Sequence, residues 1–299
     1  AEDGIRDTSV TGVQTCALPI YEKTLGQLFC DGSARQIVAM LLAECAAVGV
    51  DVRVAHRVTN IERSDRFRVT TDQGAFEATA VVLATGGLSI PKMGATGFAH
   101  DWARRFGLKM TQTRPGLVPL TLKAPELAPE LAGVSLDVVA RLGKTSFREA
   151  MLFTHRGLSG PAVLQISSYW HPGEQISIDL LPGVDAAQFL KERHHARPKA
   201  ERRTLLAEAM PQRAAQFFET VKPEQLNDWR IAPTGTEGYA KAEVTVGGID
   251  TAGLSSQTMA ARAVPGLFAI GEAVDVTGWL GGYNFQWAWS SGWAAGEAL

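Results

Sequence analysis

Two apolar segments of this chain end in small residues, where α/β sheets bind their ligands. VVLATGG spans residues 81–87 and LFAIGE spans residues 267–272. In doubly wound sheets, ligands lie beyond the carboxyl ends of the strands, and glycine there lets the backbone approach a flat ligand closely. An acidic residue such as Glu272 can accept hydrogen bonds from ribose or ribitol hydroxyls. The pattern indicates a nucleotide-type cofactor, although a sheet closing on a buried helix would have the same spacing.

The chain closes on GGYNFQWAWSSGWAAGEAL, a segment with two leading glycines, three tryptophans and almost no charge. This composition predicts a helix that is covered on most sides and preceded by a glycine turn. The free N–H groups and positive dipole end at the start of that helix favour negative charge on a ligand. A flavin gains negative charge at its N1/C2 edge on reduction, so a helix start at that edge would tune its electronics.

Other residues give weaker indications of a catalytic role. The GLSGP segment after His155 lacks the GxSxG elbow of a serine hydrolase, and no CxxxxC pair supports dithiol flavin chemistry. His155 fits either a proton donor near a flavin or a structural loop histidine, and Tyr239 and Lys241 are similar cases. Tyr283, beside the glycine turn, is a better candidate for a group that faces the substrate. The catalytic residues therefore stay unassigned.

Charge and composition narrow the classes of molecule that the chain is expected to bind. The net charge of −2 disfavours nucleic acid and anionic membranes and favours a small-molecule substrate. The basic run from Lys191 to Arg203 is interrupted by Glu192 and Glu201 and has no interleaved aromatic residues. This pattern favours a solvated helix face over one that binds nucleic acid.

No apolar run approaches the roughly 20 residues of a membrane span. The three cysteines show neither CxxC nor zinc spacing, so no metal is expected and the thiols fit a reduced, cytoplasmic protein.

Periodicity predicts the elements that position these residues. Residues 31–50 form an amphipathic helix, capped by Asp31 or Ser33 and ended by Gly49. Residues 50–62 alternate as a strand. Residues 67–87 give a strand, a turn at 72–74, a second strand and a buried parallel strand at 80–84. Residues 97–108 give a further helix.

The composition changes from Arg114 onward, where prolines separate short strand-like segments. This region indicates a separate, mostly β module, and residues 185–220 form its charged helical stretch. Strands return at 241–250 and 266–275, before the terminal helix. The ends of the chain are therefore α/β, which suits a nucleotide-binding domain with a second domain inserted into it.

Four ordered motifs, which begin VVLATGGLSIPKMG, MLFTHRGLSGPAV, KAEVTVGGID and PGLFAIGEAVD, resemble the BaiN-like, aminoacetone-oxidase-like family of FAD-binding oxidoreductases. The resemblance implies a two-dinucleotide-binding-domain flavoprotein fold, with a Rossmann-like FAD domain and an inserted β-barrel and helical subdomain. It implies FAD-binding segments at 21–114 and 246–299, with the insertion at 115–245. It also implies hydride transfer between a small organic substrate and flavin, with NAD(P)H as a possible electron donor.

The same resemblance places particular residues along the cofactor. It puts Thr85, Gly86 and Gly87 near the adenosine and pyrophosphate. It puts Gly271 and Glu272 near the pyrophosphate or ribitol, with Asp275 close by. Beside the isoalloxazine ring it puts Gly282, Tyr283, Asn284 and Gln286.

The chain departs from that family at its beginning. The family opens with a strand, a GxGxxG turn and a helix, and no GxGxxG occurs in this chain. Residues 1–20 resemble translated sequencing adapter, which predicts a truncated chain without its N-terminal βαβ unit, weak or absent FAD binding, and an exposed apolar sheet edge. The alternatives are a cofactor-free, inactive fragment and a flavin-binding module that serves a partner. The residues do not decide between oxidase and reductase.

Overall fold

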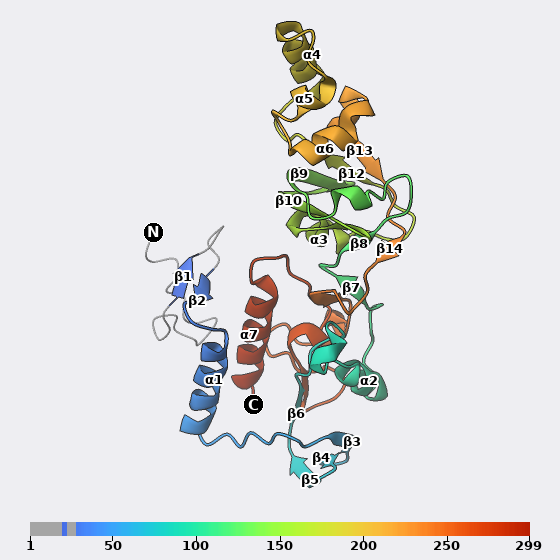
Figure 1. Ribbon diagram of the computed structural model, residues 1–299. Coiled ribbons are helices and arrows are strands. Elements are labelled where there is room, and N and C mark those ends of the chain that lie inside the picture. The colour runs from blue at the N-terminus through green and yellow to red at the C-terminus, as the bar shows by residue number, and fades with distance from the viewer. Residues whose placement is uncertain (1–19, 23–27) are drawn as a thin grey trace. The chain divides into compact units, whose positions relative to one another are not determined.

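The computed structural model describes residues 20–22 and 28–299 (Figure 1). The chain divides into two units, and each is described by itself. Unit 1 comprises Ala1–Gly87, as far as it is described, with Gly97–Thr111 and Gly247–Leu299; unit 2 comprises Leu88–Thr96 and Gln112–Val246. Residues 88–96 belong to unit 2 because the Leu88 N–H donates to Thr245 Oγ1 (2.7 Å) and the Ile90 N–H to the Tyr239 carbonyl (2.9 Å). The adapter-like segment lies outside the described residues, except for Ile20.

A parallel pair of strands forms the centre of unit 1. Strand β6 (Val81–Leu83) pairs with β16 (Leu267–Ala269), with Val81 opposite Leu267. The other edge of β16 bonds to residues 259–261. Among the described residues, no strand pairs with the other edge of β6. The parallel pairing predicted for residues 80–84 is confirmed for Val81–Leu83. The predicted burial on both faces is wrong, because Val81 and Val82 are only half-buried.

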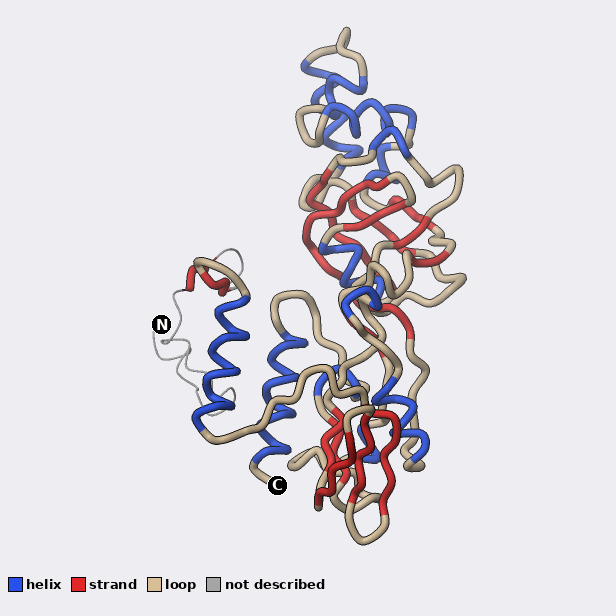
Figure 2. The backbone as a smooth tube through the Cα atoms, turned by 60° about the horizontal axis from the view of Figure 1, so that its bottom comes forward, coloured by secondary structure: helices blue, strands red, loops and turns tan. Residues whose placement is uncertain are grey.

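A three-stranded antiparallel meander leads into this pair (Figure 2). It comprises β3 (Val58–Arg63), β4 (Phe67–Thr71) and β5 (Gly74–Ala78). The strand–turn–strand pattern predicted for 67–78 is confirmed. Residues 50–57, in contrast, form no strand, so this part of the predicted strand is wrong. Their valines alternate with charged residues, but a strand also needs a neighbour, and no described strand pairs with them.

Two helices pack against the core of unit 1. Helix α2 (Phe98–Arg105) buries Trp102, and helix α7 (Tyr283–Gly296) packs on the short 3-10 helix η8 (Gly271–Ala273). The core includes Phe67, Leu83, Leu267 and Phe268. A further 3-10 helix, η7, spans Thr251–Gly253.

The first described elements are β1 (Ile20–Glu22), β2 (Leu28–Cys30) and α1 (Arg35–Ala47). Ser33 Oγ accepts from the Arg35 N–H (3.2 Å), and Gly49 ends the helix in the left-handed region at φ 73°. The predicted stop at Gly49 is therefore confirmed, whereas the predicted cap is wrong, because the N-cap is Ala34 and no side chain caps the helix. No residue of α1 is buried, so the apolar face that the pattern predicts has no covering element among the described residues.

Unit 2 is built on a seven-stranded sheet in the order β13-β12-β9-β10-β11-β8-β14. All its pairings are antiparallel. The strands are β8 (Leu120–Thr121), β9 (Ser135–Leu142), β10 (Thr145–Thr154), β11 (Gly157–Ser159), β12 (Ile176–Asp179), β13 (Trp229–Ile231) and β14 (Gly235–Thr236). The order is linear, with β13 and β14 at the edges, so the hydrogen bonds do not close the expected barrel. Residues 232–234 join these two strands, and Pro233 among them has no N–H to donate.

The remaining elements of unit 2 complete its core. Helix α3 (Pro161–Ser167) begins with proline at its first position and packs on β9 and β10. Asp185 caps α4 (Ala186–Ala196) by accepting from the Gln188 N–H (2.9 Å). The others are α5 (Arg202–Leu206), α6 (Gln212–Phe217), strands β7 (Arg114–Gly116) and β15 (Val244–Val246), and 3-10 helices η3 (Pro91–Met93), η4 (Pro129–Leu131), η5 (Phe218–Thr220) and η6 (Pro223–Leu226).

Candidate functional site

The parallel pairing of β6 with β16 brings the two glycine-containing strand ends to one edge. Thr85, Gly86 and Gly87 follow β6, and Gly271 and Glu272 follow β16. Gly86 has φ 70° and Gly271 has φ 61°, a region that side chains rarely adopt. All ten predicted cofactor residues belong to unit 1. The strand ends are adjacent for the reason the sequence suggested, since carboxyl ends of parallel strands meet at one edge.

Helix α7 holds the turn at Gly271 through two side chains. Ser291 Oγ accepts from the Gly271 N–H (2.9 Å) and donates to the Trp287 carbonyl (2.8 Å). Trp287 Nε1–H donates to the Gly271 carbonyl (3.0 Å). Both backbone polar groups of Gly271 are therefore used by the protein. Gly271 sets the position of the turn, and its own N–H has an internal partner.

The start of α7 is a preorganised glycine turn. Gly281 has φ 110° and Gly282 has φ 95°, and no atom lies within 4 Å of a Cβ built on Gly282. Asn284 Oδ1 accepts from the Gly278 N–H (2.8 Å), while Nδ2 donates to the Gly278 carbonyl (3.1 Å). Asn284 thus folds the preceding loop onto the helix. A Cβ on Gly278 would lie 2.6 Å from that of Tyr283, so this close approach requires glycine.

Aromatic side chains surround this turn without being covered. Tyr283 is 58% exposed, Phe285 70% and Trp279 50%. Trp279 and Tyr283 meet edge to face, with ring centroids 6.5 Å apart. Farther along α7, Trp293 is 47% exposed, and only Ser291 and Ala295 are buried. The helix is therefore covered on one face, whereas its composition predicted cover on most sides.

Sequence reasoning missed Thr277, which lies between η8 and α7. Its Oγ1 is buried and has no hydrogen-bond partner among the described residues. Buried hydroxyls are nearly always satisfied, so an unpaired one suggests an absent partner. No sequence signal marks it, because TG occurs in ordinary turns. Glu272, Asp275 and Gln286 lie in the same stretch; the first two are half-buried, and Gln286 is exposed.

A buried histidine supports the turn. His100 on α2 is 2% exposed, and its Nε2 lies 3.2 Å from the Ala273 carbonyl of η8. Burial lowers the pKa of His100 below its ordinary 6.5, although the hydrogen bond to Ala273 acts in the opposite direction. The neutral ring is the form that fits this position, so His100 supports the fold beneath the site.

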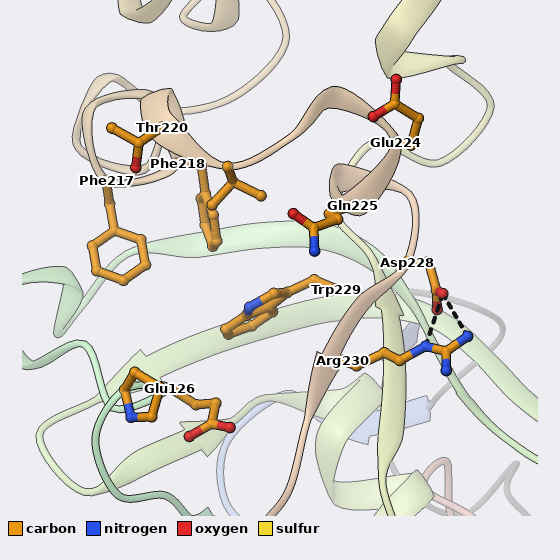
Figure 3. Close-up of a pocket in the computed structure, with 11 residues that line it drawn as sticks. Glu126, Phe217, Phe218, Thr220, Glu224, Gln225, Asp228, Trp229 and Arg230 are labelled. Atoms are coloured by element: carbon orange, nitrogen blue, oxygen red, sulfur yellow. Dashed lines mark hydrogen bonds and ion pairs between the residues drawn. The ribbon is translucent and has the colours of Figure 1, made fainter.

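A separate cavity of about 680 Å³ lies within unit 2 (Figure 3). Phe217, Phe218 and Trp229 supply its aromatic lining, and Phe218 meets Trp229 edge to face at 5.4 Å. Arg230 Nε donates to Asp228 Oδ2 (2.9 Å) at one side, as the dashed lines show. Glu126 and Glu224 add two further carboxylates. None of the residues predicted for the cofactor lines this cavity.

The other residues singled out in the sequence, His155, Tyr239 and Lys241, belong to unit 2. The described residues contain no group of three or more side chains arranged to hold a metal ion. None of their helices combines the length and apolar character that crossing a bilayer requires.

The profile of the HI0933-like protein Rossmann domain family matches residues 7–298. The chain belongs to this family. The match confirms the Rossmann-type α/β expectation, and it begins inside the segment that resembles adapter sequence.

Curated relatives extend this assignment. The chain is 50% identical over 301 residues to a ribosomal RNA dihydrouridine synthase of Escherichia coli K12, covering 93% of the chain and 75% of the relative. It is 42% identical to a protein of the same name from Haemophilus influenzae, covering 93% and 76%. It is 30% identical to a 3-dehydro-bile acid delta(4,6)-reductase of Clostridium scindens, covering 89% and 73%. A reductase among the relatives agrees with an oxidoreductase-type family.

Proposed function

We propose that this protein is an FAD-dependent reductase that saturates a carbon–carbon double bond conjugated to a carbonyl group. Its preferred substrate is a uracil base in ribosomal RNA. The observation that carries the proposal is the 50% identity, over 93% of the chain, to a ribosomal RNA dihydrouridine synthase. The expectation of a small-molecule substrate rested on net charge and on the family resemblance, and we give this identity more weight than either.

The names of the relatives describe one kind of chemistry. Dihydrouridine is uridine with its C5–C6 bond saturated, and that double bond is conjugated to the C4 carbonyl. A 3-dehydro steroid with double bonds at positions 4 and 6 likewise conjugates them to its ketone. Each double bond that is saturated takes a hydride at one carbon and a proton at the other. This shared chemistry favours a reductase over an oxidase and makes NAD(P)H the natural electron donor.

The residues at the start of α7 fit the ring half of FAD. The Thr277 hydroxyl has no partner among the described residues, and the N–H groups of a first helical turn have no acceptor within their helix. Open space beside Gly282 leaves room for a ligand next to these donors. Bound FAD supplies the hydride when it is reduced. The N–H groups and positive dipole end at the start of α7 would favour negative charge on the pyrimidine edge of the ring. Gly282 lies roughly 7.5 Å along the helix from Trp287, at 1.5 Å per residue, so the site extends toward the Gly271 turn.

The proton needs a donor at the same end. The side chain of Tyr283 is 58% exposed, beside the turn that would face the ring. We assign to Tyr283 the role of holding, at its hydroxyl oxygen, the proton that the reduction requires. Trp279, which meets Tyr283 edge to face, can exclude water from one side of a bound base.

A second candidate substrate is a conjugated ketone of steroid type. The observation that favours it is the exposed aromatic surface of Trp279, Tyr283 and Phe285, which suits a flat apolar molecule. The 30% identity to a bile acid reductase supports the same class.

The first experiment tests the cofactor. The purified full chain is incubated with FAD and passed through gel filtration, and the flavin absorbance that travels with the protein is measured. Thr277→Val should weaken FAD binding without lowering the free energy of unfolding, because it removes a hydroxyl that is unpaired in the free protein. Thr204→Val, on the exposed surface of unit 2, is the matched control. A protein that carries no flavin would favour the cofactor-free alternative.

The second experiment tests the substrate. The FAD-loaded chain is supplied with NADH or NADPH and either an unmodified ribosomal RNA transcript or a 3-oxo-4,6-diene bile acid. Mass spectrometry of the RNA nucleosides should detect dihydrouridine. Reduction of the bile acid alone would select the second candidate. Reduction of neither substrate by a flavin-loaded protein would leave the flavin-binding module as the better description.

A further inference from the structure

Unit 2 carries a concentrated positive charge that the proposed reduction does not use. Between residues 186 and 203 lie six lysines and arginines and two histidines, against two glutamates. They lie on α4, on α5 and in the loop between them, and α4 packs against both α5 and η6. The whole chain has a net charge of −2, so this is a local excess.

Part of this charge is balanced within the subdomain. Glu208 pairs with two arginines, at 2.8 Å from Arg193 Nε and also with Arg197. Arg203 pairs with Glu201. One carboxylate therefore serves two guanidinium groups, and the pair of arginines at Glu208 keeps a positive charge.

The remaining cations have no carboxylate partner. Lys191 and Lys199 are exposed and form no hydrogen bond or ion pair within the described chain. Arg202 donates to a neutral acceptor, the Val221 carbonyl. Its Nε is buried and finds no partner among the same residues.

Two of these cations, Lys191 and Arg202, line a cavity of about 450 Å³, and Lys199 lies in the loop between α4 and α5, outside that lining. Lys191 and His194 line it from one face of α4, and Arg202 lines it from α5. Leu190 and Leu205 contribute apolar lining. The ammonium of Lys191 and the guanidinium of Arg202 offer only donors, and the imidazole of His194 adds a further N–H, so the set complements a phosphate group.

The cavity in Figure 3 has the opposite character. Glu126 and Glu224 line it, and its arginine, Arg230, is paired with Asp228. A polyanion would meet carboxylates there. The cationic side of unit 2 is therefore the α4–α5 basic face, defined by Lys191, His194, Lys199 and Arg202.

We propose that the α4–α5 basic face binds the phosphodiester backbone of the RNA whose base is reduced. This proposal rests on the proposed function, because RNA is the substrate assigned there. Phosphate contacts fix the position of a protein on a nucleic acid without reading its sequence. The face therefore supplies affinity, whereas the end of α7 supplies the reaction.

The test measures binding of a fluorescein-labelled RNA hairpin with a uridine-containing loop to the full chain, by fluorescence anisotropy over a series of KCl concentrations. Lys191→Gln/Lys199→Gln removes two exposed charges that hold no structural partner. The matched control is Lys123→Gln/Lys144→Gln, which removes two exposed charges elsewhere in unit 2. Thermal melting of each variant verifies that the fold is unchanged.

The slope of log Kd against log salt should fall by about two in the α4–α5 variant, at about one per lysine, and stay unchanged in the control. The affinity should fall severalfold and to the same extent for hairpins of different sequence. Equal binding by both variants, or no RNA binding by the wild-type chain, overturns the proposal. So does polyglutamate that binds this face as tightly as the RNA, since an acidic protein would then be the better partner.

A dihydrouridine assay on the same proteins separates this proposal from the proposed function. Dihydrouridine formed equally by the wild type and the α4–α5 variant, with equal RNA binding, rejects the docking face and keeps the reductase. RNA binding that depends on Lys191 and Lys199, with no dihydrouridine formed by flavin-loaded protein, keeps the docking face and rejects the reaction.

Discussion

The two units differ in how they cover their apolar side chains. Among the described residues, eighteen large hydrophobic side chains are exposed; fourteen belong to unit 1 and four to unit 2. Unit 2 closes its core between the seven-stranded sheet and helices α3 to α6. Within the described part of unit 1, one edge of β6 is unpaired, α1 has no buried residue and one face of α7 is open.

This difference indicates where each unit needs a partner. The open surface at the start of α7 in unit 1 is aromatic and glycine-rich, as suits a flat cofactor. The α4–α5 basic face is the cationic surface of unit 2. A ligand that binds only the folded state stabilises it by mass action, so FAD should raise the melting temperature of unit 1 selectively. The predictions below test whether the two units differ in this way.

The largest effect should come from the core of unit 2. Phe218 is fully buried and contacts both Phe153 and Trp229. Phe218→Ala should lower the free energy of unfolding by about 3–5 kcal/mol, because it removes buried surface and leaves a cavity. Urea denaturation followed by tryptophan fluorescence measures this. Phe285→Ala in α7 is the control, and a comparable loss there would mean that α7 is covered after all.

A smaller effect should come from the junction between α7 and the Gly271 turn. Ser291→Ala leaves the Gly271 N–H without its acceptor, which should cost about 1–3 kcal/mol. Ser290→Ala, one residue away, removes only a contact of 3.3 Å with Gln286. Urea denaturation of both variants gives the comparison. Equal, small effects would show that the turn is held by packing alone.

Sequence periodicity anticipated the local elements of unit 1 well. The meander strands at 67–78, the strand at 80–84 and the stop at Gly49 depend on near neighbours in the chain. Residues 50–57 show where such reasoning fails. Val50, Val52 and Val54 alternate as in a strand, yet all three are exposed and unpaired. Alternation records a preference, whereas pairing requires an adjacent strand.

The candidate site likewise has a part that could be predicted from the sequence and a part that could not. The glycine ends of β6 and β16 were predictable, because a glycine at a strand end is visible in the sequence. The functions of Ser291 and Trp287, which hold Gly271 from sixteen to twenty residues away, were not. Nor was Thr277, because an unpaired hydroxyl is recognisable only once its surroundings are folded. The basic run was visible, but its unbalanced charge depends on which carboxylates reach it.

The stabilities of the two units should also change in opposite directions as the pH falls. Burial lowers the pKa of His100 in unit 1 below 6.5. Below that pH the unfolded state binds more protons than the folded state, so the stability of unit 1 should fall as the pH drops through this window. His100→Gln should flatten this dependence in thermal melts between pH 5 and pH 7.5, with the range set by the ordinary histidine pKa.

Glu149 in unit 2 provides the contrast. Burial raises its pKa above 4.5, and a hydrogen bond from Gln165 offsets this only in part. The folded state then binds more protons in the window above 4.5, so unit 2 should gain stability from Glu149 as the pH falls through it. Glu149→Gln should remove that gain. Melts that shift in the same direction for both units would contradict these assignments.

The smallest change in stability should follow substitution of the open face of α7. Phe285 and Trp293 are 70% and 47% exposed, so Phe285→Ser/Trp293→Ser should alter the free energy of unfolding by only about 0.5 kcal/mol per site. The same variant should aggregate more slowly at high concentration, because it breaks an exposed apolar patch. Light scattering measures this, with Phe98→Ser on the packed helix α2 as the control. If the α7 variant unfolds as readily as that control, the face is covered in solution, and the contrast between the units is smaller than their exposed side chains indicate.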